Sequence, residues 1–113
     1  MPEQGDIVLI PIPFTDLSSQ KRRPVIVVSN NKYNQKTTDL VVVAMTSNPA
    51  DVAHSFTINN SDLEQGSLNR PGKVRADKIY TLSQNIIVKI FGRVNQKTIA
   101  RVQQEIIALT AQE

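Results

Sequence analysis

Short apolar runs separated by polar, turn-forming stretches dominate the chain and predict mainly β-structure. The runs are rich in valine and isoleucine, whose branched side chains favour strands. Residues 40–46 are apolar at nearly every position, so we expect this strand to be covered on both faces. The predicted strands are residues 6–12, 24–29, 40–46, 55–58, 72–82 and 86–94.

The last part of the chain has a different period. Apolar residues recur there at spacings of three and four, which predicts an amphipathic helix that packs through one face. Asn95 precedes this stretch and is a plausible N-cap. The apolar stripe consists of Ile99, Val102, Ile106 and Leu109.

Polar stretches connect the predicted elements. Residues 14–23 and 30–39 are expected to be loops or turns, and a short helical turn is expected within residues 60–66. For so short a chain, this order of elements predicts a curved, mostly antiparallel sheet closed on itself, with the terminal helix packed against it.

Composition limits the classes of function. The 113 residues are enough for one domain with a modest core, which we expect to span residues 1–113. The chain has no cysteine, which excludes disulfides, thiolate metal sites and a cysteine nucleophile. His54 is the single histidine, so a zinc site would need carboxylates for nearly all its ligands, and no motif around it supports a catalytic triad.

The first six residues and the apolar runs bear on location. Residues 1–6 carry neither the positive nor the apolar region of a signal peptide, and the longest apolar run, residues 40–45, is far too short to cross a bilayer. We therefore expect a cytoplasmic protein without a membrane partner.

Charge is mildly basic, with a formal net charge of +3 and a pI near 9.5. This bias permits an anionic partner but does not require one. The positive residues are concentrated locally, which is more informative than their total. One cluster comprises Lys21, Arg22 and Arg23, and a second comprises Arg70, Lys73, Arg75 and Lys78.

Four motifs occur in a fixed order: GDIV at residues 5–8, RRPVIVV at 22–28, VVVAMTS at 41–47 and GKVRADKIYT at 72–81. Together with the terminal helix, they resemble the PemK/MazF-type toxins, or mRNA interferases, of type II toxin–antitoxin systems. The resemblance covers essentially the whole chain. It implies a small SH3-like barrel of the CcdB/PemK type that acts as a homodimer.

The same resemblance implies an activity. Proteins of this family are sequence-specific endoribonucleases that cut single-stranded mRNA without a metal ion or other cofactor, leaving a 2′,3′-cyclic phosphate and a 5′-hydroxyl. A cognate antitoxin blocks the active groove. The chemistry needs a group that takes the 2′ proton, a donor for the leaving oxygen, and positive charge near the phosphorane.

Along the predicted strand at residues 72–82, alternation places Lys73, Arg75 and Asp77 on one polar face, with Val74 and Ala76 on the other. A simple ion pair would account for Arg75 and Asp77 as well as an acid–base couple would. The resemblance implies that Asp77 takes the 2′ proton and that Arg75 protonates the leaving group or holds phosphate. Because a guanidinium has a pKa of about 12.5 or above, we favour charge stabilisation for Arg75.

The other candidates come from the ends of strands. The resemblance puts Arg23 and the Thr46–Ser47 pair at the active groove, although hydroxyls at strand ends often bond only to backbone. Phe56 is a candidate for base stacking, with core packing as the alternative. The predicted catalytic residues are Arg23, Thr46, Arg75 and Asp77, the predicted RNA-binding residues are Lys21, Arg22, Ser47, Phe56, Arg70 and Lys73, and no metal ligand is predicted.

The chain departs from the family pattern in its first loop. Some members have a histidine or glutamate there, whereas residues 16–20 read DLSSQ. Either Asp16 or Gln20 takes that place, or the site works without such a group.

Three other functions are compatible with parts of the sequence. A gyrase poison of the same fold would need an aromatic residue near the helix end, which residues 111–113 (AQE) lack. A binding module or inactive regulatory relative would not need the candidate catalytic set, and the few aromatics argue against a proline-peptide groove. A metal-dependent nuclease would need converging carboxylates, whereas the aspartates are scattered singly.

Overall fold

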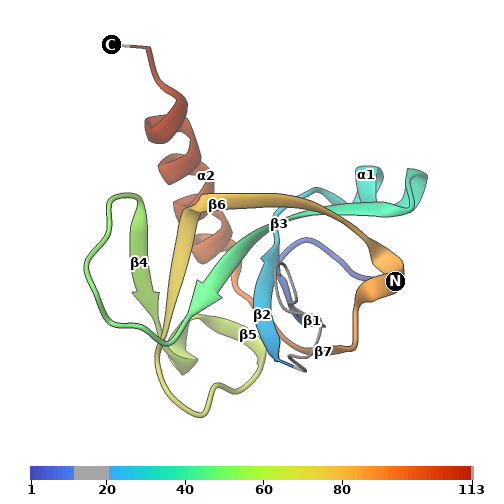
Figure 1. Ribbon diagram of the computed structural model, residues 1–113, viewed down its shortest axis with the longest axis horizontal. Helices are drawn as coiled ribbons and strands as arrows, with labels where there is room; N and C mark the ends of the chain where they lie inside the picture. Colours follow the sequence, from blue (N-terminus) through green and yellow to red (C-terminus); the bar gives the residue numbers. More distant parts are fainter. Residues whose placement is uncertain (12–20, 113) are drawn as a thin grey trace.

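The computed structural model describes residues 1–11 and 21–112, which are organised around a curved antiparallel sheet (Figure 1). The described strands are hydrogen-bonded in the order β4-β6-β3-β2-β1-β7-β5, and each pairing is antiparallel. The predictions made for Asp16 and Gln20, and for the loop at residues 14–20, lie outside the described residues. The strands are β1 (Asp6–Pro11), β2 (Arg22–Val27), β3 (Asp39–Thr46), β4 (Ser55–Ile58), β5 (Leu63–Gly66), β6 (Gly72–Ser83) and β7 (Lys89–Val94).

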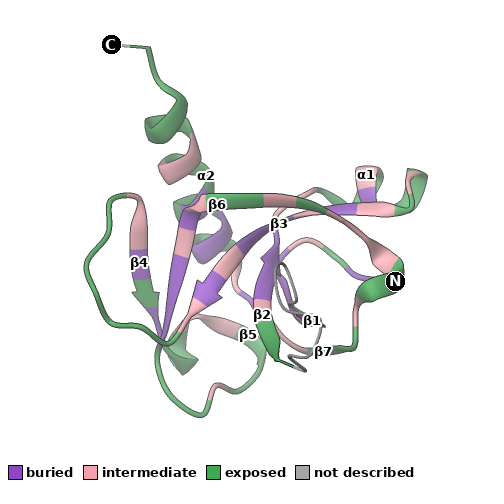
Figure 2. Cartoon of the chain, in the orientation of Figure 1, coloured by how far each residue is buried: buried purple, intermediate pink, exposed green. Residues whose placement is uncertain are grey.

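Strand β3 lies inside the sheet, between β6 and β2, and has an apolar cluster on each face. Val43 and Met45 point into one cluster, which the terminal helix also enters through Val102. Leu40 and Val42 belong to the second cluster, on the opposite face. The prediction that this strand is covered on both faces is therefore confirmed, and Figure 2 shows the buried residues concentrated on the central strands.

Strand β6 bends sharply in its middle (Figure 1). Its partner β3 pairs Val43 with Ile79 and the next residue, Ala44, with Arg75. Residues 76–78 therefore have no counterpart on β3, and such an insertion kinks a strand and re-aims its side chains. The predicted alternation of faces along residues 72–82 is interrupted at this point.

Two short elements differ from the sequence-based predictions. The polar stretch expected to be turn-like contains helix α1 (Asn31–Lys36), because Asn30 caps it by accepting a hydrogen bond from Tyr33 N at 2.8 Å. Its buried Asn34 donates to Ser29 O at 3.0 Å, which ties the helix to the end of β2.

The second difference lies in residues 60–66. The expected helical turn is limited to a 3-10 turn, η1 (Asn60–Asp62), and the rest forms strand β5. Gly66 ends this strand at φ +81°, and a Cβ on it would lie 2.4 Å from Phe91 O on β7. Close backbone approach thus requires glycine here.

Helix α2 (Gln96–Thr110) confirms the predicted terminal helix. Asn95 caps it by accepting a hydrogen bond from Thr98 N at 2.9 Å, and Ile99 and Val102 are buried in the core. The end of the helix projects away from the sheet, where Ile107 is 68% exposed (Figure 1). None of the helices in the described ranges is long and apolar enough to span a membrane.

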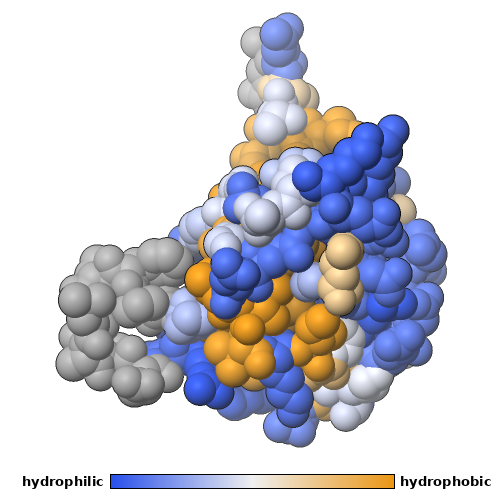
Figure 3. Space-filling view, turned by 90° about the vertical axis from the view of Figure 1, so that its right-hand side faces the viewer, coloured by the Kyte–Doolittle hydropathy of each residue, from blue (hydrophilic) through white to orange (hydrophobic). Residues whose placement is uncertain are grey.

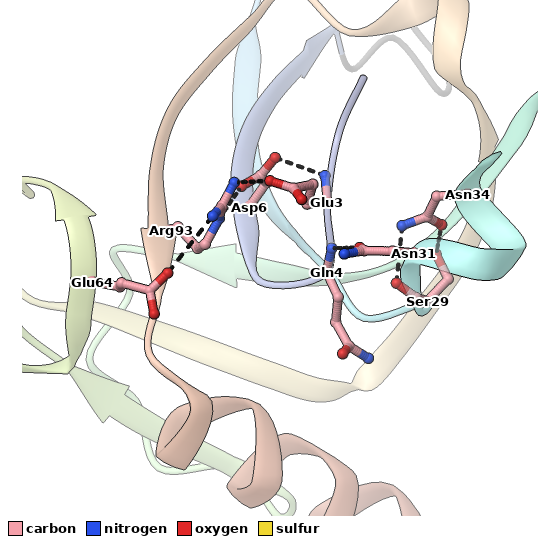
Figure 4. A network of polar contacts seen from close by, with 8 residues as sticks. All are labelled: Glu3, Gln4, Asp6, Ser29, Asn31, Asn34, Glu64 and Arg93. Carbon is pink, nitrogen blue, oxygen red and sulfur yellow. Dashed lines mark hydrogen bonds and ion pairs between the residues drawn. The ribbon is translucent and has the colours of Figure 1, made fainter.

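A charged cluster fastens the N-terminal segment to β7 (Figure 4). Arg93 Nε donates to Asp6 Oδ1 at 2.8 Å, and its guanidinium also pairs with Glu3 and, at 3.6 Å, with Glu64. Asp6 is only 3% exposed, and its hydrogen bond raises the pKa of Arg93. Three carboxylates surround this single guanidinium. The cluster therefore has a structural role, which is to join the N-terminal segment and β5 to β7, and we call it the Arg93 joint.

Candidate functional site

Three neighbouring strands, β2, β3 and β6, bring distant residues together toward one end of the strands. Ala44 on β3 pairs with Val25 on β2 and with Arg75 on β6. Arg23 and Thr46 each lie two residues beyond the Val25–Ala44 pair, in the same direction because the strands are antiparallel. The strand order thus joins residues that are more than fifty positions apart in the sequence.

A hollow of about 260 Å³ opens beside these strands, and we call it the Arg75 hollow. It has an apolar lining and several cationic residues, and none of the described residues that line it is acidic. The lining consists of Ile10, Arg23, Pro24, Val25, Ala44, Met45, Thr46, Asn48, Ala50, Val52, Lys73, Arg75, Lys78 and Tyr80.

Arg75 and Asp77 form a two-pronged ion pair next to the Arg75 hollow. Arg75 Nε donates to Asp77 Oδ1 at 2.8 Å, and Nη2 donates to Oδ2 at 2.7 Å. These hydrogen bonds lower the pKa of Asp77 from its ordinary value and raise the pKa of Arg75. Asp77 is therefore ionised at neutral pH, and Arg75 is an even poorer proton donor than a free guanidinium.

Thr46 and Arg23 line the Arg75 hollow with different polar groups. Thr46 is half-buried, and its Oγ1 accepts a hydrogen bond from Asn48 N at 3.2 Å. Because the acceptor side is used, the hydroxyl proton can be directed to an oxygen of a ligand. Arg23 is exposed, and its guanidinium is available to an anion that enters the hollow.

A second hollow of about 370 Å³ adjoins the first, and we call it the Arg70 hollow. The two share the wall formed by Arg23, Pro24, Met45 and Thr46. No acidic residue is among the described residues that line it. Four of the predicted RNA-binding residues line it, namely Lys21, Arg22, Ser47 and Arg70.

Two of the sequence-predicted residues have a different environment from the one expected. Phe56 is 5% exposed and belongs to the main core, with Arg101 Cζ 4.1 Å from the centre of its ring. It lines neither hollow, so the alternative of core packing applies.

Lys73 lines the Arg75 hollow but is only 6% exposed. Its Nζ donates to Pro49 O at 3.1 Å and Ala50 O at 3.0 Å, and it pairs with Asp51 at 3.3 Å. The charge of Lys73 is thus used to hold the loop that follows β3. Its ammonium hydrogens are therefore engaged with that loop.

Sequence reasoning missed three residues of the Arg75 hollow: Asn48, Lys78 and Tyr80. Lys78 belongs to the second basic cluster, and Tyr80 lies within the GKVRADKIYT motif, so both carried a signal in the sequence. Asn48 carried none beyond its place in a strand-ending turn. The bend in β6 brings Lys78 and Tyr80 round to the same hollow as Arg75.

The single histidine of the chain lies against the terminal helix. His54 Nδ1 lies 3.1 Å from Glu105 Oε1 on α2. Within residues 1–11 and 21–112, no group of three or more His, Cys, Asp or Glu side chains could hold a metal ion.

A curled, antiparallel, seven-stranded sheet with a C-terminal helix places the described part of the chain in a mostly-β class of half-barrel folds, in which β4 and β5 are the end strands and do not pair with each other. Residues 3–110 match the family described as PemK-like, MazF-like toxin of type II toxin–antitoxin systems, and the chain belongs to this family. No curated protein sequence matches the chain significantly.

Solved structures have the same fold at low sequence identity. An endoribonuclease from a mycobacterial species, solved with its cognate antitoxin, superposes with a TM-score of 0.77 at 23% identity, covering 96% of this chain and 93% of the other. A MazE–MazF complex from Deinococcus radiodurans gives 0.77 at 23% identity, covering 96% and 94%. The Mycobacterium tuberculosis toxin MazF-mt6 gives 0.72 at 16% identity, covering 91% and 93%.

Proposed function

We propose that this toxin, with residues 1–113 acting as one domain, is an endoribonuclease that cuts single-stranded RNA without a metal ion. One observation carries the proposal. Arg23, Thr46 and Arg75 come from three separate strands and line one hollow, while Asp77 is held against Arg75 at its edge. Fixed positive charge beside an ionised carboxylate is what attack by a 2′-hydroxyl on its own phosphate requires.

The phosphate is bound first. Its oxygens lie between the guanidinium groups of Arg23 and Arg75, and the hydroxyl of Thr46 donates to one of them. Arg75 makes both its recorded hydrogen bonds to Asp77 in the free protein, so binding of phosphate competes with that pair. As Arg75 turns toward the phosphate, the pKa of Asp77 rises and the carboxylate becomes a stronger base.

Asp77 then takes the proton of the 2′-hydroxyl, and the 2′-oxygen forms a bond to phosphorus. The bond from phosphorus to the 5′-oxygen breaks, which leaves a 2′,3′-cyclic phosphate and a 5′-hydroxyl. Arg23 and Arg75 stabilise the extra negative charge of the phosphorane. The raised pKa of Arg75 suits it to hold charge and not to give up a proton. The leaving 5′-oxygen therefore takes its proton from solvent, and Asp77 returns the 2′ proton to solvent, which regenerates the carboxylate.

The proposal includes partners. The cationic hollows, with no acidic residue among the described residues lining them, suit an acidic segment of a cognate antitoxin as well as RNA. We also propose a homodimer, because apolar side chains gather on an exposed face (Figure 3), and Ile86, Val88 and Ile90 are each more than a third exposed. With mRNA as substrate, we expect the protein to act in the cytoplasm.

A cleavage assay tests the proposal. A long single-stranded RNA is incubated with the protein in EDTA, and the ends of the products are mapped. We expect discrete cuts with cyclic-phosphate ends from the natural protein, and none from Arg75→Ala. Lys36→Ala, which removes an exposed cation of α1 that lines neither hollow, is the matched control and should cut normally.

Two results would contradict the proposal. Cleavage that disappears in EDTA would indicate a metal-dependent reaction. If Arg75→Ala cut RNA at the natural rate, the Arg75 hollow would not be the active site.

A further inference from the structure

A third hollow lies next to the Arg70 hollow. It shares Asn69 and Phe91 with that hollow, and we call it the Lys89 hollow. The three hollows therefore follow one another along the surface, from the Arg75–Asp77 pair to β7. The Lys89 hollow is lined by Leu9, Gly66, Ser67, Asn69, Lys89 and Phe91.

The charged residues lining these three hollows have one sign, and the adjoining hollow that shares Gly66, Lys89 and Phe91 contains Asp6, which is paired with Arg93. None of the described residues that line the three hollows is acidic. Arg22, Arg70 and Lys89 form no ion pair with any described residue, and all three are exposed. Unneutralised cations in a row attract a polyanion and follow its backbone.

Phe91 lies at the junction of the Arg70 and Lys89 hollows. It is the extra residue of a β-bulge, because Ile7 pairs with Gly92 while Val8 pairs with Ile90. A bulge re-aims its side chain. The ring is partly buried against the main core and also lines both hollows, so it forms a supported apolar surface beside the cations.

The backbone under Phe91 is closely constrained. Gly66 approaches it so tightly that a Cβ on Gly66 would meet Phe91 O at 2.4 Å. The backbone of Phe91 is therefore held in place. Less conformational entropy is then lost when a base stacks on the Phe91 ring.

We propose that the row of hollows is an extended binding site for the nucleotides on one side of the cut, with one base stacked on Phe91 and a phosphate beside Lys89. This rests on the function proposed above, and it names where the rest of the RNA lies. Aromatic stacking next to a cationic groove is the arrangement by which proteins hold single strands with little base preference.

The experiment begins with the cut sites that the natural protein makes in a long RNA. Synthetic RNAs containing one such site are then shortened from either end, and KM and kcat are measured for each. For RNAs that keep both flanks, we expect Phe91→Leu to raise KM about tenfold with little change in kcat. Phe91→Tyr, which keeps a stacking ring, should stay near the natural KM.

One flank should matter and the other should not. Removing the nucleotides that reach Phe91 should raise KM for the natural protein and abolish the difference between it and Phe91→Leu. A tenfold effect that persists on RNA shortened at both flanks would overturn the extended site, because the substitution would then be acting on the reacting centre.

Lys89→Ala gives a second test that does not depend on the core. The slope of log affinity against log salt concentration should fall by about one for this variant, as expected for one lost phosphate contact. Lys97→Ala, an exposed cation of α2 outside the three hollows, should keep the natural slope. Unchanged KM in Phe91→Leu and an unchanged slope in Lys89→Ala, with normal cutting by the natural protein, would overturn the extended site and leave the proposed function standing.

Discussion

Two arginines in this molecule pair with aspartates in similar ways, yet their surroundings differ. Arg93 and Arg75 each hold a carboxylate at 2.8 Å or closer, and each has its pKa raised by that contact. Arg93 is surrounded by the three carboxylates of Asp6, Glu3 and Glu64. Arg75 pairs only with Asp77 among the described residues, and it lines a hollow with other cations.

The difference shows that the number of carboxylates and cations around an Arg–Asp pair decides whether the pair only stabilises the fold or can also bind phosphate. Around Arg93, the carboxylates outnumber the cation, so an incoming phosphate would be repelled. Around Arg75, the single carboxylate can be displaced by phosphate, because Arg23 and Lys78 line the same hollow. The local pair is the same in both places, and the neighbouring charges determine what it can do.

The largest expected effect comes from the same substitution at the two arginines. Arg75→Gln should reduce RNA cleavage by about 100-fold to 1,000-fold, because charge stabilisation of the phosphorane is lost. Its unfolding midpoint in denaturant should stay close to that of the natural protein, since the pair is partly exposed. A clearly lower unfolding midpoint for Arg75→Gln would show that the Arg75–Asp77 pair is structural, as the Arg93 pair is.

Arg93→Gln should have the opposite outcome. Loss of its guanidinium leaves the buried carboxylate of Asp6 without its charged partner, which should cost about 2 kcal/mol of unfolding free energy. Urea unfolding measures this cost, and cleavage per folded molecule should be unchanged. If the folded variant lost specific activity, Arg93 would contribute to RNA cleavage as well as to stability.

Lys73 combines features of the two arginines. It lines the Arg75 hollow, as Arg75 does, but its ammonium group holds a loop in place, as Arg93 holds the N-terminal segment. Lys73→Met removes the hydrogen bonds to the carbonyls of Pro49 and Ala50, which should cost about 1 kcal/mol. Amide exchange in residues 47–53 should become faster. Unchanged exchange there would mean that the buried ammonium does not hold the loop.

The smallest effect is a shift in the titration of Asp77. Its pKa is lowered from 3.8 because Arg75 donates hydrogen bonds to the carboxylate. The stability from this pair is present above the unfolded pKa and is lost as pH falls through the lower folded value. Carboxyl-carbon NMR should give a midpoint below 3.8 for Asp77, and a higher midpoint in Arg75→Gln. Equal midpoints would contradict the assigned cause.

Much of the fold was predictable from local pattern. Apolar runs identified β3 and its burial on both faces, and the spacing of Ile99 and Val102 with Asn95 before them identified α2 and its cap. These features depend on residues near one another in the sequence. Motifs in the chain also pointed to Arg23, Thr46, Arg75 and Asp77, although no pattern could establish that the first three line one hollow.

Other features required contacts between distant segments. Strand β5 exists because it pairs with β7, and α1 is held by the contact of its buried Asn34 with Ser29. Period-two alternation assigned Lys73 to a polar face, but it could not reveal that the carbonyls of residues 49 and 50 surround its ammonium. Phe56 was a stacking candidate until the core around it was known.

The sequence by itself determined the six apolar strands, the start of the terminal helix and which side chains carry charge, because these follow from local propensity and periodicity. The tertiary structure alone decided which strands are neighbours, where β6 bends and which cations stay unneutralised. The physical reason is that a side chain's periodicity specifies the face it occupies, whereas its function depends on the groups that the rest of the chain brings to that face.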